Sequence, residues 1–378
     1  MAEPTYDVAV VGLGAMGSQT LAALARRGAR VVGVDRFAPP HAEGSSHGRS
    51  RIIREAYFED PIYVPLVQRA YEGWRRLEAE SGHPLLRTTG GLWFGRPNGA
   101  LVEGTLRSVA AHALPHERLD AAEIRRRFPA FRAADDWIGI LEPRAGVLDP
   151  EGAIAAALAV AARHGARIVP DTPVLAWEAR PDHVAVRTPG GTLRADRLVL
   201  STGMWMTALV PTLTRHLTVQ RNVLYWFDAL DPEAFAPARC PVFLAELSAT
   251  RMLYGFPDLG EGVKVALHHH GPVCTPEAVD RVVAAGEVEA MRALLRDWLP
   301  AANGPLRATA VCTYTNVPDG HFILDRHPRS ERVWLASPCS GHGFKFSPAI
   351  GEVLADLALT GSTWIDLTPF GLARFGDA

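Results

Sequence analysis

A thiol and a phenol share one face of a short segment near the end of the chain. In AVCTYT, residues 310–315, Cys312 and Tyr314 are two positions apart, and in a strand such residues point to the same side. Free cysteine is among the most buried residue types, so Cys312 can be explained as a small core side chain. The alternative is a functional thiol, and the remaining motifs have to decide between the two.

A lysine and a histidine share another strand face in EGVKVALHHHG, residues 261–271. With a two-residue period, Lys264, His268 and His270 lie on one face and three aliphatic residues lie on the other. Because the aliphatic face must pack on the core, the face with Lys264 either meets solvent or lines a site. We predict no metal site here, because only two of the three adjacent histidines share a face and no carboxylate or thiol lies at ligand spacing.

Three glycines follow an aliphatic run in YDVAVVGLGAMGSQTLAALARRGARVVGVD, residues 6–35. They have the G-x-G-x-x-G spacing, and Asp35 ends a second aliphatic run. Gly12 permits a tight turn, Gly14 lets the backbone approach a pyrophosphate, and Gly17 allows close contact between helix and strand. The helix N-terminus favours phosphate, and Asp35 can accept the ribose hydroxyls of an adenosine. The unit predicts dinucleotide binding, but FAD and NAD share the ADP half that it would hold.

A helix with cations and glycines before it is predicted in SGHGFKFSPAIGEVLADLALTG. It begins near Ser347 and stops at Gly361, and Lys345 stands just before it. The glycines Gly341 and Gly343 let the backbone come close to a ligand. A flavin ring suits this place, because a helix N-terminus and a lysine stabilise the negative charge that develops on its pyrimidine edge on reduction.

The segments that must position these residues predict an α/β chain of about two domains. A second α/β piece runs from AGVLDPEGAIAAALAVAARHGARIV into HVAVRTPGGTLRADRLVLSTGMW and extends the first sheet. Aromatic, alternating segments such as GGLWFGRP and NVLYWFDA favour an antiparallel sheet. We therefore expect a Rossmann-like nucleotide domain and a second domain built on an antiparallel β-sheet flanked by helices. The first takes residues 1–85, 146–216 and 305–378, and the second takes 86–145 and 217–304.

Composition argues against several classes of protein. Hydrophobic residues make up 48% of the 378 and charged residues 21%, as in ordinary globular proteins. A net charge of −2 gives no basic field for nucleic acid or an anionic membrane, and no long apolar run predicts a membrane span. The four cysteines show no CxxC spacing, and the first residues lack the pattern of a secretory signal. We expect a cytoplasmic enzyme with neither nucleic-acid nor membrane partners.

Several long motifs together resemble the family of monomeric sarcosine oxidase and N-methyl-L-tryptophan oxidase, flavin-dependent amine oxidases of the D-amino acid oxidase-like superfamily. The resemblance covers nearly the whole chain. Besides the glycine motif, it rests on PPHAEGSSHGRSRIIREAY, YGFP followed by KVALH, CTYT with PDGHFILDRHP, SGHGFKFSPAIGEVLADLALTG and DLTPFGLARF. It implies FAD attached covalently, by an 8α-S-cysteinyl bond at the motif cysteine, Cys312. The functional thiol is thereby favoured over the core side chain.

The resemblance also implies roles for individual residues. Arg54 and Lys345 match the pair that binds the substrate carboxylate, and Lys264 matches the lysine that activates dioxygen. The implied substrate-binding residues are Arg54, Lys345, Tyr254, Tyr314, His268 and Gly341. The implied catalytic residues are Lys264, His268, Tyr254 and Arg51. The cofactor-binding residues are Gly12, Gly14, Gly17, Asp35, Ser45, Ser50, Arg51, Cys312, His342, Gly343 and Lys345.

The activity implied by the resemblance is oxidation of a secondary amino acid, N-methyl or cyclic, to an imine that water hydrolyses, with O2 reduced to hydrogen peroxide. The substrate stays open, because Leu267 and Cys339 depart from the family pattern near the pocket, and Ser46 and Arg49 stand where a histidine and an acid are common. The alternatives are a dehydrogenase with another electron acceptor, a non-catalytic flavin scaffold and an NAD-dependent enzyme. The expected partners are a small amino acid and O2, and the family name implies a monomer.

Overall fold

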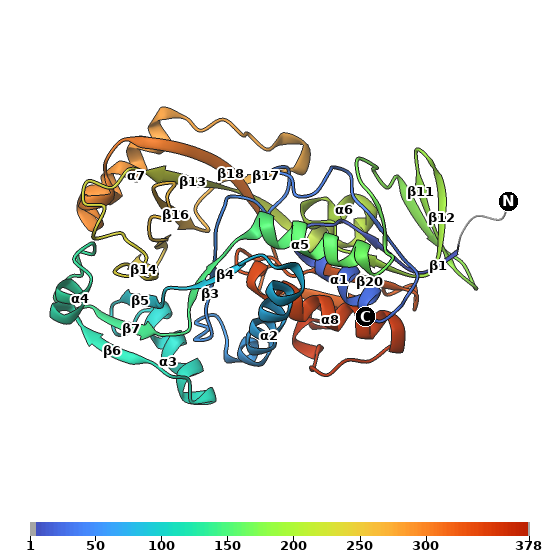
Figure 1. The fold of residues 1–378 in the computed structure, drawn as a ribbon, viewed down its shortest axis with the longest axis horizontal. Helices are drawn as coiled ribbons and strands as arrows, with labels where there is room; N and C mark the ends of the chain where they lie inside the picture. Colours follow the sequence, from blue (N-terminus) through green and yellow to red (C-terminus); the bar gives the residue numbers. More distant parts are fainter. Residues whose placement is uncertain (1–4, 377–378) are drawn as a thin grey trace.

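Two large β-sheets organise residues 5–376, which the computed structural model describes (Figure 1). The first sheet has eight strands in the order β10-β11-β12-β1-β2-β9, with β20 pairing with β12 and with β19. Its core pairs run parallel, and the β10-β11-β12 meander and β19 are antiparallel. The strands are β1 (Thr5–Val11), β2 (Val31–Val34), β9 (Arg167–Val169), β10 (Ala176–Ala179), β11 (Val184–Thr188), β12 (Gly191–Leu200), β19 (Ile323–Arg326) and β20 (Val333–Ser337).

Helices bury this parallel core. They are α1 (Ala15–Arg26), α2 (Val64–Ser81), α5 (Pro150–Arg163), α6 (Met206–Leu209) and α8 (Ser347–Thr360). The first of them, α1, contacts both α5 and α8, and its Leu21 and Leu24 are fully buried. The predicted stop of the last helix is confirmed, because Gly361 takes the left-handed conformation that ends α8, with a φ of +81°.

The second sheet has nine strands in the order β17-β13-β16-β15-β14-β5-β7-β6, with β18 also paired to β13. Helices α3 (Ala100–His112) and α4 (Ala121–Arg127) contact it, and α7 (Ala285–Trp298) lies between its strands β17 and β18 in the chain. The strands are β5 (Gly91–Gly95), β6 (Glu117–Asp120), β7 (Ile138–Glu142), β13 (Thr218–Phe227), β14 (Val242–Ser248), β15 (Arg251–Gly255), β16 (Val263–His268), β17 (Val273–Cys274) and β18 (Leu306–Asn316). The predicted α/β class, with a Rossmann-like sheet and a second, antiparallel sheet, is confirmed. One pair, β14 with β5, runs parallel instead.

A small sheet consists of β3 (Arg51–Ile53), β8 (Gly146–Leu148) and β4 (Leu86–Thr88). Its strands lie in the segments where the chain crosses from one large sheet to the other. All of its pairs are antiparallel. It fixes the segment that follows the first parallel strands, and with it the side chains of Arg51 and Arg54.

The sheets suggest a domain division that differs from the expected one in the placement of β18 and of β4, which pairs with β8 of the small sheet. Strand β18 pairs with β13 along its length, so it belongs to the second sheet, although residues 305–378 were assigned to the nucleotide domain. We therefore propose a boundary after Asn316. The sequence could not predict this boundary, because the strand that pairs with β18 lies about ninety residues away. The local alternation of hydrophobic and polar residues does not show which strand is the partner.

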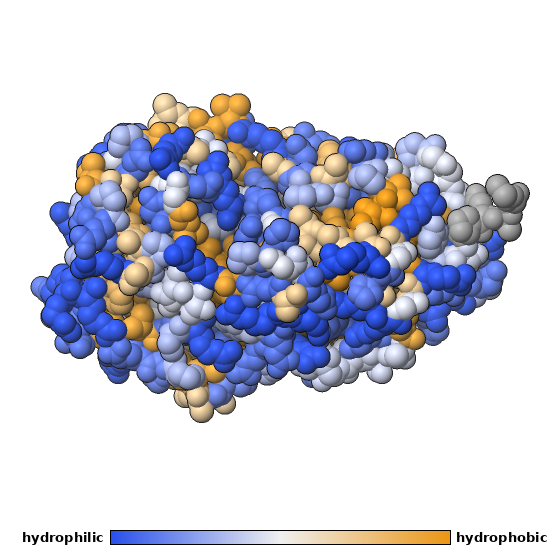
Figure 2. Space-filling view, viewed as in Figure 1, coloured by the Kyte–Doolittle hydropathy of each residue, from blue (hydrophilic) through white to orange (hydrophobic). Residues whose placement is uncertain are grey.

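Hydrophilic side chains dominate the face of the protein seen in Figure 2, and hydrophobic ones are scattered over it in small groups. Within residues 5–376, no helix is long and apolar enough to cross a bilayer. Over the same range, no three histidine, cysteine or acidic side chains gather as a metal-ligand group.

Candidate active site

The glycine-rich turn joins β1 to α1 and borders a cavity. Gly12 has a φ of +88°, and a Cβ on it would lie 2.6 Å from the carbonyl oxygen of Ser201. A Cβ on Gly17 would lie 1.7 Å from the Gly12 carbonyl oxygen, so helix and strand approach here as only glycine permits. At Gly14 a Cβ would meet Ser46 Oγ at 3.4 Å, an ordinary contact. The start of α1 is therefore open to close approach by a ligand.

Asp35 stands at the end of β2 beside this turn, and it is 6% exposed. Its Oδ2 accepts a hydrogen bond of 2.6 Å from the Leu13 backbone N–H, and its Oδ1 accepts one of 2.9 Å from Phe37. Both oxygens keep lone pairs that a bound hydroxyl group can use. The carboxylate is thus fixed in one orientation at the edge of the cavity.

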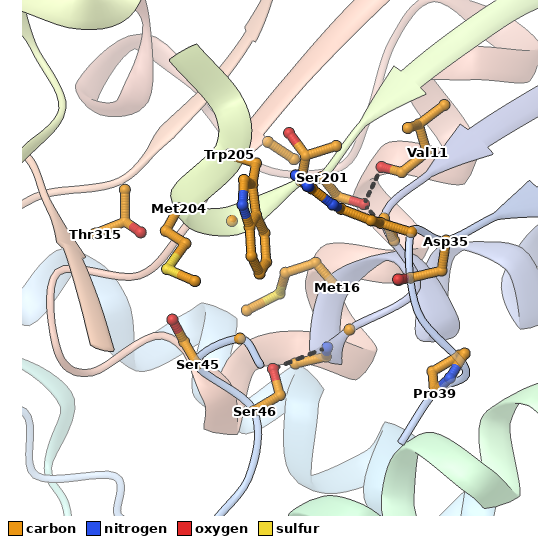
Figure 3. Close-up of a pocket in the computed structure, with 18 of the residues that line it drawn as sticks. Val11, Met16, Asp35, Pro39, Ser45, Ser46, Ser201, Met204, Trp205 and Thr315 are labelled. Carbon is orange, nitrogen blue, oxygen red and sulfur yellow. Dashed lines mark hydrogen bonds between the residues drawn. The ribbon is translucent and has the colours of Figure 1, made fainter. Parts of the chain in front are cut away.

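Two adjoining cavities, of about 220 Å³ and about 100 Å³, extend from the glycine-rich turn toward the second sheet. Figure 3 shows the first, with Asp35 on one side, Ser45 on the other, and Trp205 and Met16 between them. The lining residues common to both cavities are Ser45, Cys339 and Phe344. An elongated ligand can therefore pass from one cavity into the other.

The second cavity brings together the residues to which the sequence assigned catalysis and substrate binding. Its lining includes Ser45, Ser50, Arg51, Arg54, Tyr254, Lys264, His268, Cys312, Tyr314, Gly341, His342, Gly343 and Lys345. Gly12, Gly14 and Asp35 line the first cavity, whereas Gly17 lines neither and acts through helix packing. Strands β13, β15, β16 and β18 supply one wall, and the segments around β3 and before α8 supply the other.

Cys312 lies on β18 and is 2% exposed. Its Sγ is 3.5 Å from the Ser45 carbonyl oxygen and 3.5 Å from a terminal nitrogen of Arg51. The same guanidinium donates to the carbonyl oxygens of Ser50, at 2.8 Å, and of Ser45, at 2.9 Å. The backbone of residues 45–50 therefore holds a positive charge against the thiol, where it stabilises negative charge on sulfur or on a neighbouring ligand.

Lys264 is 2% exposed on β16, and all of its polar partners come from one turn. Its Nζ donates to the carbonyl oxygens of Gly48, at 2.6 Å, and Ser50, at 2.8 Å, and to Ser50 Oγ at 3.1 Å. Burial, followed by the charge of Arg51, lowers the pKa of Lys264 well below its usual value. The ammonium has three acceptors, which keeps its charge possible in this buried position.

Arg54 and Lys345 lie on the far side of the second cavity, but the predicted cation pair already has an anion. Arg54 is 3% exposed, and one terminal nitrogen donates to both carboxylate oxygens of Glu59, at 2.7 and 2.6 Å. Burial raises the pKa of Glu59, yet the charges of Arg54 and Lys345 together hold it below its usual value. Sequence reasoning missed Glu59, because a single acid outside any motif carries no spacing signal.

The Lys345 ammonium donates to the His342 carbonyl oxygen at 2.7 Å and to Tyr57 Oη at 3.2 Å. Burial lowers its pKa well below the usual value, and Arg54 lowers it further. The His342 ring is also fully engaged, with Nδ1 2.7 Å from Tyr57 Oη and Nε2 3.0 Å from the Gly320 carbonyl oxygen. Burial lowers the pKa of His342 to about 4, so this ring is a neutral wall of the cavity.

Gly341 shapes the contact between the segment before α8 and the second sheet. Its φ is +75°, and a Cβ on it would lie 2.8 Å from His268 Cε1 and 2.8 Å from Tyr314 Cε2. Tyr314 Oη accepts a hydrogen bond of 3.2 Å from the Asn222 amide and lies 3.4 Å from His268 Nδ1. Tyr254 contacts His268 edge-on. These side chains form one polar, aromatic wall.

Comparison with known proteins agrees with this geometry. A family model described as FAD dependent oxidoreductase matches residues 7–357. Monomeric sarcosine oxidase of Streptomyces avermitilis is 44% identical over 367 residues, covering 95% of each chain. N-methyl-L-tryptophan oxidase of Yersinia pestis is 36% identical over 372 residues, covering 98% of this chain and 99% of its own. The chain belongs to the family of FAD-dependent oxidoreductases.

Solved structures place the fold in the same family. The open form of NikD, described as an unusual amino acid oxidase essential for nikkomycin biosynthesis, is 27% identical, with a TM-score of 0.85 and 97% of each chain covered. L-proline dehydrogenase from P. horikoshii also has a TM-score of 0.85, covering 99% of this chain and 98% of its own. At 20% identity, this second likeness concerns the fold alone.

The residues present fit the FAD of this oxidoreductase family. The glycine cradle and Asp35 border one end of the connected cavities, and Cys312 with its basic neighbours borders the other. Ser46, Ser201 and Trp205 also line the first cavity and were missed from the sequence. Ser201 and Trp205 follow β12 in STGMW, where an aromatic residue at the carboxyl end of a parallel strand was the available signal.

Proposed function

We propose that the protein is a flavin-dependent oxidase of secondary amino acids, either N-methylated or cyclic. The amine is oxidised to an imine, O2 is reduced to hydrogen peroxide, and water hydrolyses the imine. Bound FAD supplies the two-electron chemistry. The observation that carries the proposal is the second cavity. It adjoins the first cavity and is lined by Cys312, Lys264 and the Arg54–Lys345 pair.

Charge in the cavity supports an amino acid as the substrate. Arg54, Lys264 and Lys345 are nearly fully buried, and Glu59 is the one acid among the described residues that line this cavity. A substrate carboxylate therefore compensates positive charge that the protein leaves unbalanced. The same cations disfavour a protonated amine, so the pocket selects the neutral amine, which has the electron pair that oxidation requires.

Individual side chains take distinct parts in the proposal. Arg54 and Lys345 bind the carboxylate, with Glu59 holding the Arg54 fork in place until the substrate competes for it. His268, Tyr254 and Tyr314, together with Gly341, surround the rest of the substrate. Arg51, with Ser45, Ser50, His342 and Gly343, borders the flavin. Lys264 places a cation where negative charge develops as O2 is reduced.

We further propose that FAD is attached through Cys312 Sγ at the 8α position. The thiol is buried in the wall of the second cavity, beside the Arg51 guanidinium and 3.5 Å from the carbonyl oxygen of Ser45, which lines both cavities. We also propose a monomeric, cytoplasmic protein. None of the four cysteines forms a disulfide, which fits a reducing compartment. The sarcosine oxidase of Streptomyces avermitilis is named monomeric.

Peroxide release tests the proposed reaction. Purified holoenzyme is mixed in air with sarcosine, N-methyl-L-tryptophan, L-proline and, as a control, an N-methylamine without a carboxylate. We expect one peroxide per amine consumed for at least one amino acid and no turnover of the control, because the buried cations require the acid group. Substrate-dependent bleaching of the flavin that yields no peroxide, with electrons passing to an added dye, would establish the dehydrogenase instead.

A further inference from the structure

Residues 48–50 form a turn with two successive residues in the left-handed region. Gly48 has a φ of +105°, and a Cβ on it would lie 2.5 Å from Leu224 Cδ1. Arg49 has a φ of +66°, which is costly for a residue with a side chain. The turn directs the backbone N–H groups of Gly48 and Arg49 to the same side, where they form a concave site for an anion.

The anion that fills this site is the Glu151 carboxylate, in the first turn of α5. Its Oε1 accepts hydrogen bonds from the backbone N–H of Gly48, at 2.7 Å, and of Arg49, at 3.1 Å, and its Oε2 accepts from Arg49 at 3.1 Å. Charge-assisted hydrogen bonds of this kind are stronger than neutral ones. Glu151 therefore offsets the backbone strain at Arg49 and fixes the turn.

The opposite side of the same turn holds Lys264. The Gly48 carbonyl oxygen accepts the 2.6 Å hydrogen bond from Lys264 Nζ, and Ser50 supplies its other two acceptors. We propose that Glu151 is a positioning residue that sets the place and the charge of Lys264 through the strained turn at residues 48–50. This inference rests on the proposed function of Lys264 in oxygen reduction.

Electrostatics adds a second link between these residues. Burial is the main cause that lowers the pKa of Lys264, and Arg51 and Arg49 lower it further, whereas the Cys312 and Glu151 charges raise it. A thioether at Cys312 carries no charge, so with flavin attached Glu151 is the remaining anion of the two. Removing its charge should therefore lower the pKa of the Lys264 ammonium further.

The test separates the two half-reactions of the holoenzyme. Stopped-flow absorbance follows flavin reduction by an amino acid without oxygen, and then reoxidation of the reduced enzyme by O2. In Glu151→Gln we expect the rate of flavin reoxidation to fall by about tenfold, because one charge-assisted hydrogen bond is lost. The rate of flavin reduction should change little. The alkaline limb of the reoxidation pH profile should also move to lower pH. Glu261→Gln, which removes a carboxylate 3.4 Å from the Arg49 side chain, is the matched control.

A second measurement does not depend on turnover. Glycine adopts a positive φ without strain, so Arg49→Gly should raise the urea midpoint of the wild-type holoenzyme more than that of Glu151→Ala, in which the released turn no longer holds residue 49 in the strained conformation. The double variant should also recover part of the reoxidation rate. Glu151→Asp, which keeps the charge, replaces the alanine variant if that variant does not fold. Its reoxidation rate should lie between those of the wild type and Glu151→Gln.

Lys264→Met distinguishes failure of this inference from failure of the proposed function. If Lys264→Met slows reoxidation by about a hundredfold, as loss of an electrostatic stabiliser does, the role of Lys264 stands. Equal slowing of both half-reactions in Glu151→Gln, or no slowing at all, then overturns only the positioning role. If Lys264→Met leaves reoxidation unchanged, the proposed role of Lys264 falls, and the positioning role falls with it.

Discussion

Buried charge is the dominant property of individual side chains in the second cavity. Lys264, Lys345 and Arg54 are each less than a tenth exposed, and backbone carbonyl groups solvate much of their charge. Such solvation is fixed in direction, unlike water, and so it costs no reorganisation when a reaction develops negative charge nearby. The same burial lowers the pKa of the histidines around the site, which makes the stability of the protein sensitive to acid.

His342 provides a prediction for that sensitivity. Its pKa is about 4 in the folded protein and about 6.5 when exposed, so the unfolded chain binds more protons between these values. Stability from this group is complete above pH 6.5 and is lost as pH falls toward 4, by about 2 kcal/mol between pH 7.5 and 5. We expect urea midpoints of His342→Gln to fall less over that interval than those of the wild type.

The control for this experiment is His83→Gln, at an exposed position after α2. It should leave the pH dependence of the midpoint as in the wild type. If the pH dependence is unchanged in His342→Gln as well, His342 is protonated in the folded protein over the same pH range as an exposed histidine. That result would contradict its burial as a neutral ring.

At the scale of elements, the site depends on how closely the segment before α8 approaches the second sheet. Gly341→Ala places a methyl group 2.8 Å from His268 and Tyr314 at a positive φ. We expect KM for the amino acid to rise by about tenfold or more, because these rings must shift by a distance that packed side chains do not tolerate freely. Steady-state peroxide assays measure it.

Gly361→Ala is the matched control, since its φ of +81° is similar but nothing lies within 4 Å of the added methyl group. It should lower stability by about 1 kcal/mol through the strained helix end and leave KM unchanged. Equal effects of both variants on KM would show that strain alone, rather than contact with the site, explains the result at Gly341.

Elements differ in how far the sequence could predict them. The β1-α1-β2 unit was predictable because Gly12, Gly17 and Asp35 each meet a local geometric demand that few other residues satisfy. The position of β18 beside β13 was not, because strand pairing over long separations depends on the whole sheet. Strand and helix patterns picked out several of the cavity residues, but only the resemblance to a family joined them into one site, since they come from segments far apart in the chain.

Two acids illustrate the limit most clearly. Glu59 fixes the guanidinium of Arg54 and Glu151 fixes the turn that holds Lys264, yet neither belongs to a motif that indicates this role. Their chemistry arises from partners that only the folded chain brings within 3 Å. The sequence motifs contain Arg54 and Lys264, but no motif indicates that Glu59 and Glu151 orient them.

At the scale of the whole molecule, the site lies where the two large sheets meet. The nucleotide sheet supplies the glycine-rich turn, which borders the first cavity, and β18 of the second sheet (Figure 1) carries Cys312, which lines the second cavity. In the proposed function, one domain would hold the ADP half of the cofactor and the other would enclose the reacting end. Specificity for the amino acid can then change in the second sheet without loss of cofactor binding.

Attachment of FAD to Cys312 tests this account most directly. The holoenzyme is denatured in acid, the pellet is digested, and its peptides are weighed by mass spectrometry. We predict that the yellow colour stays with the pellet and that the peptide containing Cys312 carries the mass of FAD. Cys312→Ser should release the flavin, whereas Cys339→Ser, which replaces the other cysteine that lines the second cavity, should retain it. Flavin that stays in the supernatant of the wild type, or that remains bound to Cys312→Ser after denaturation, would contradict the account.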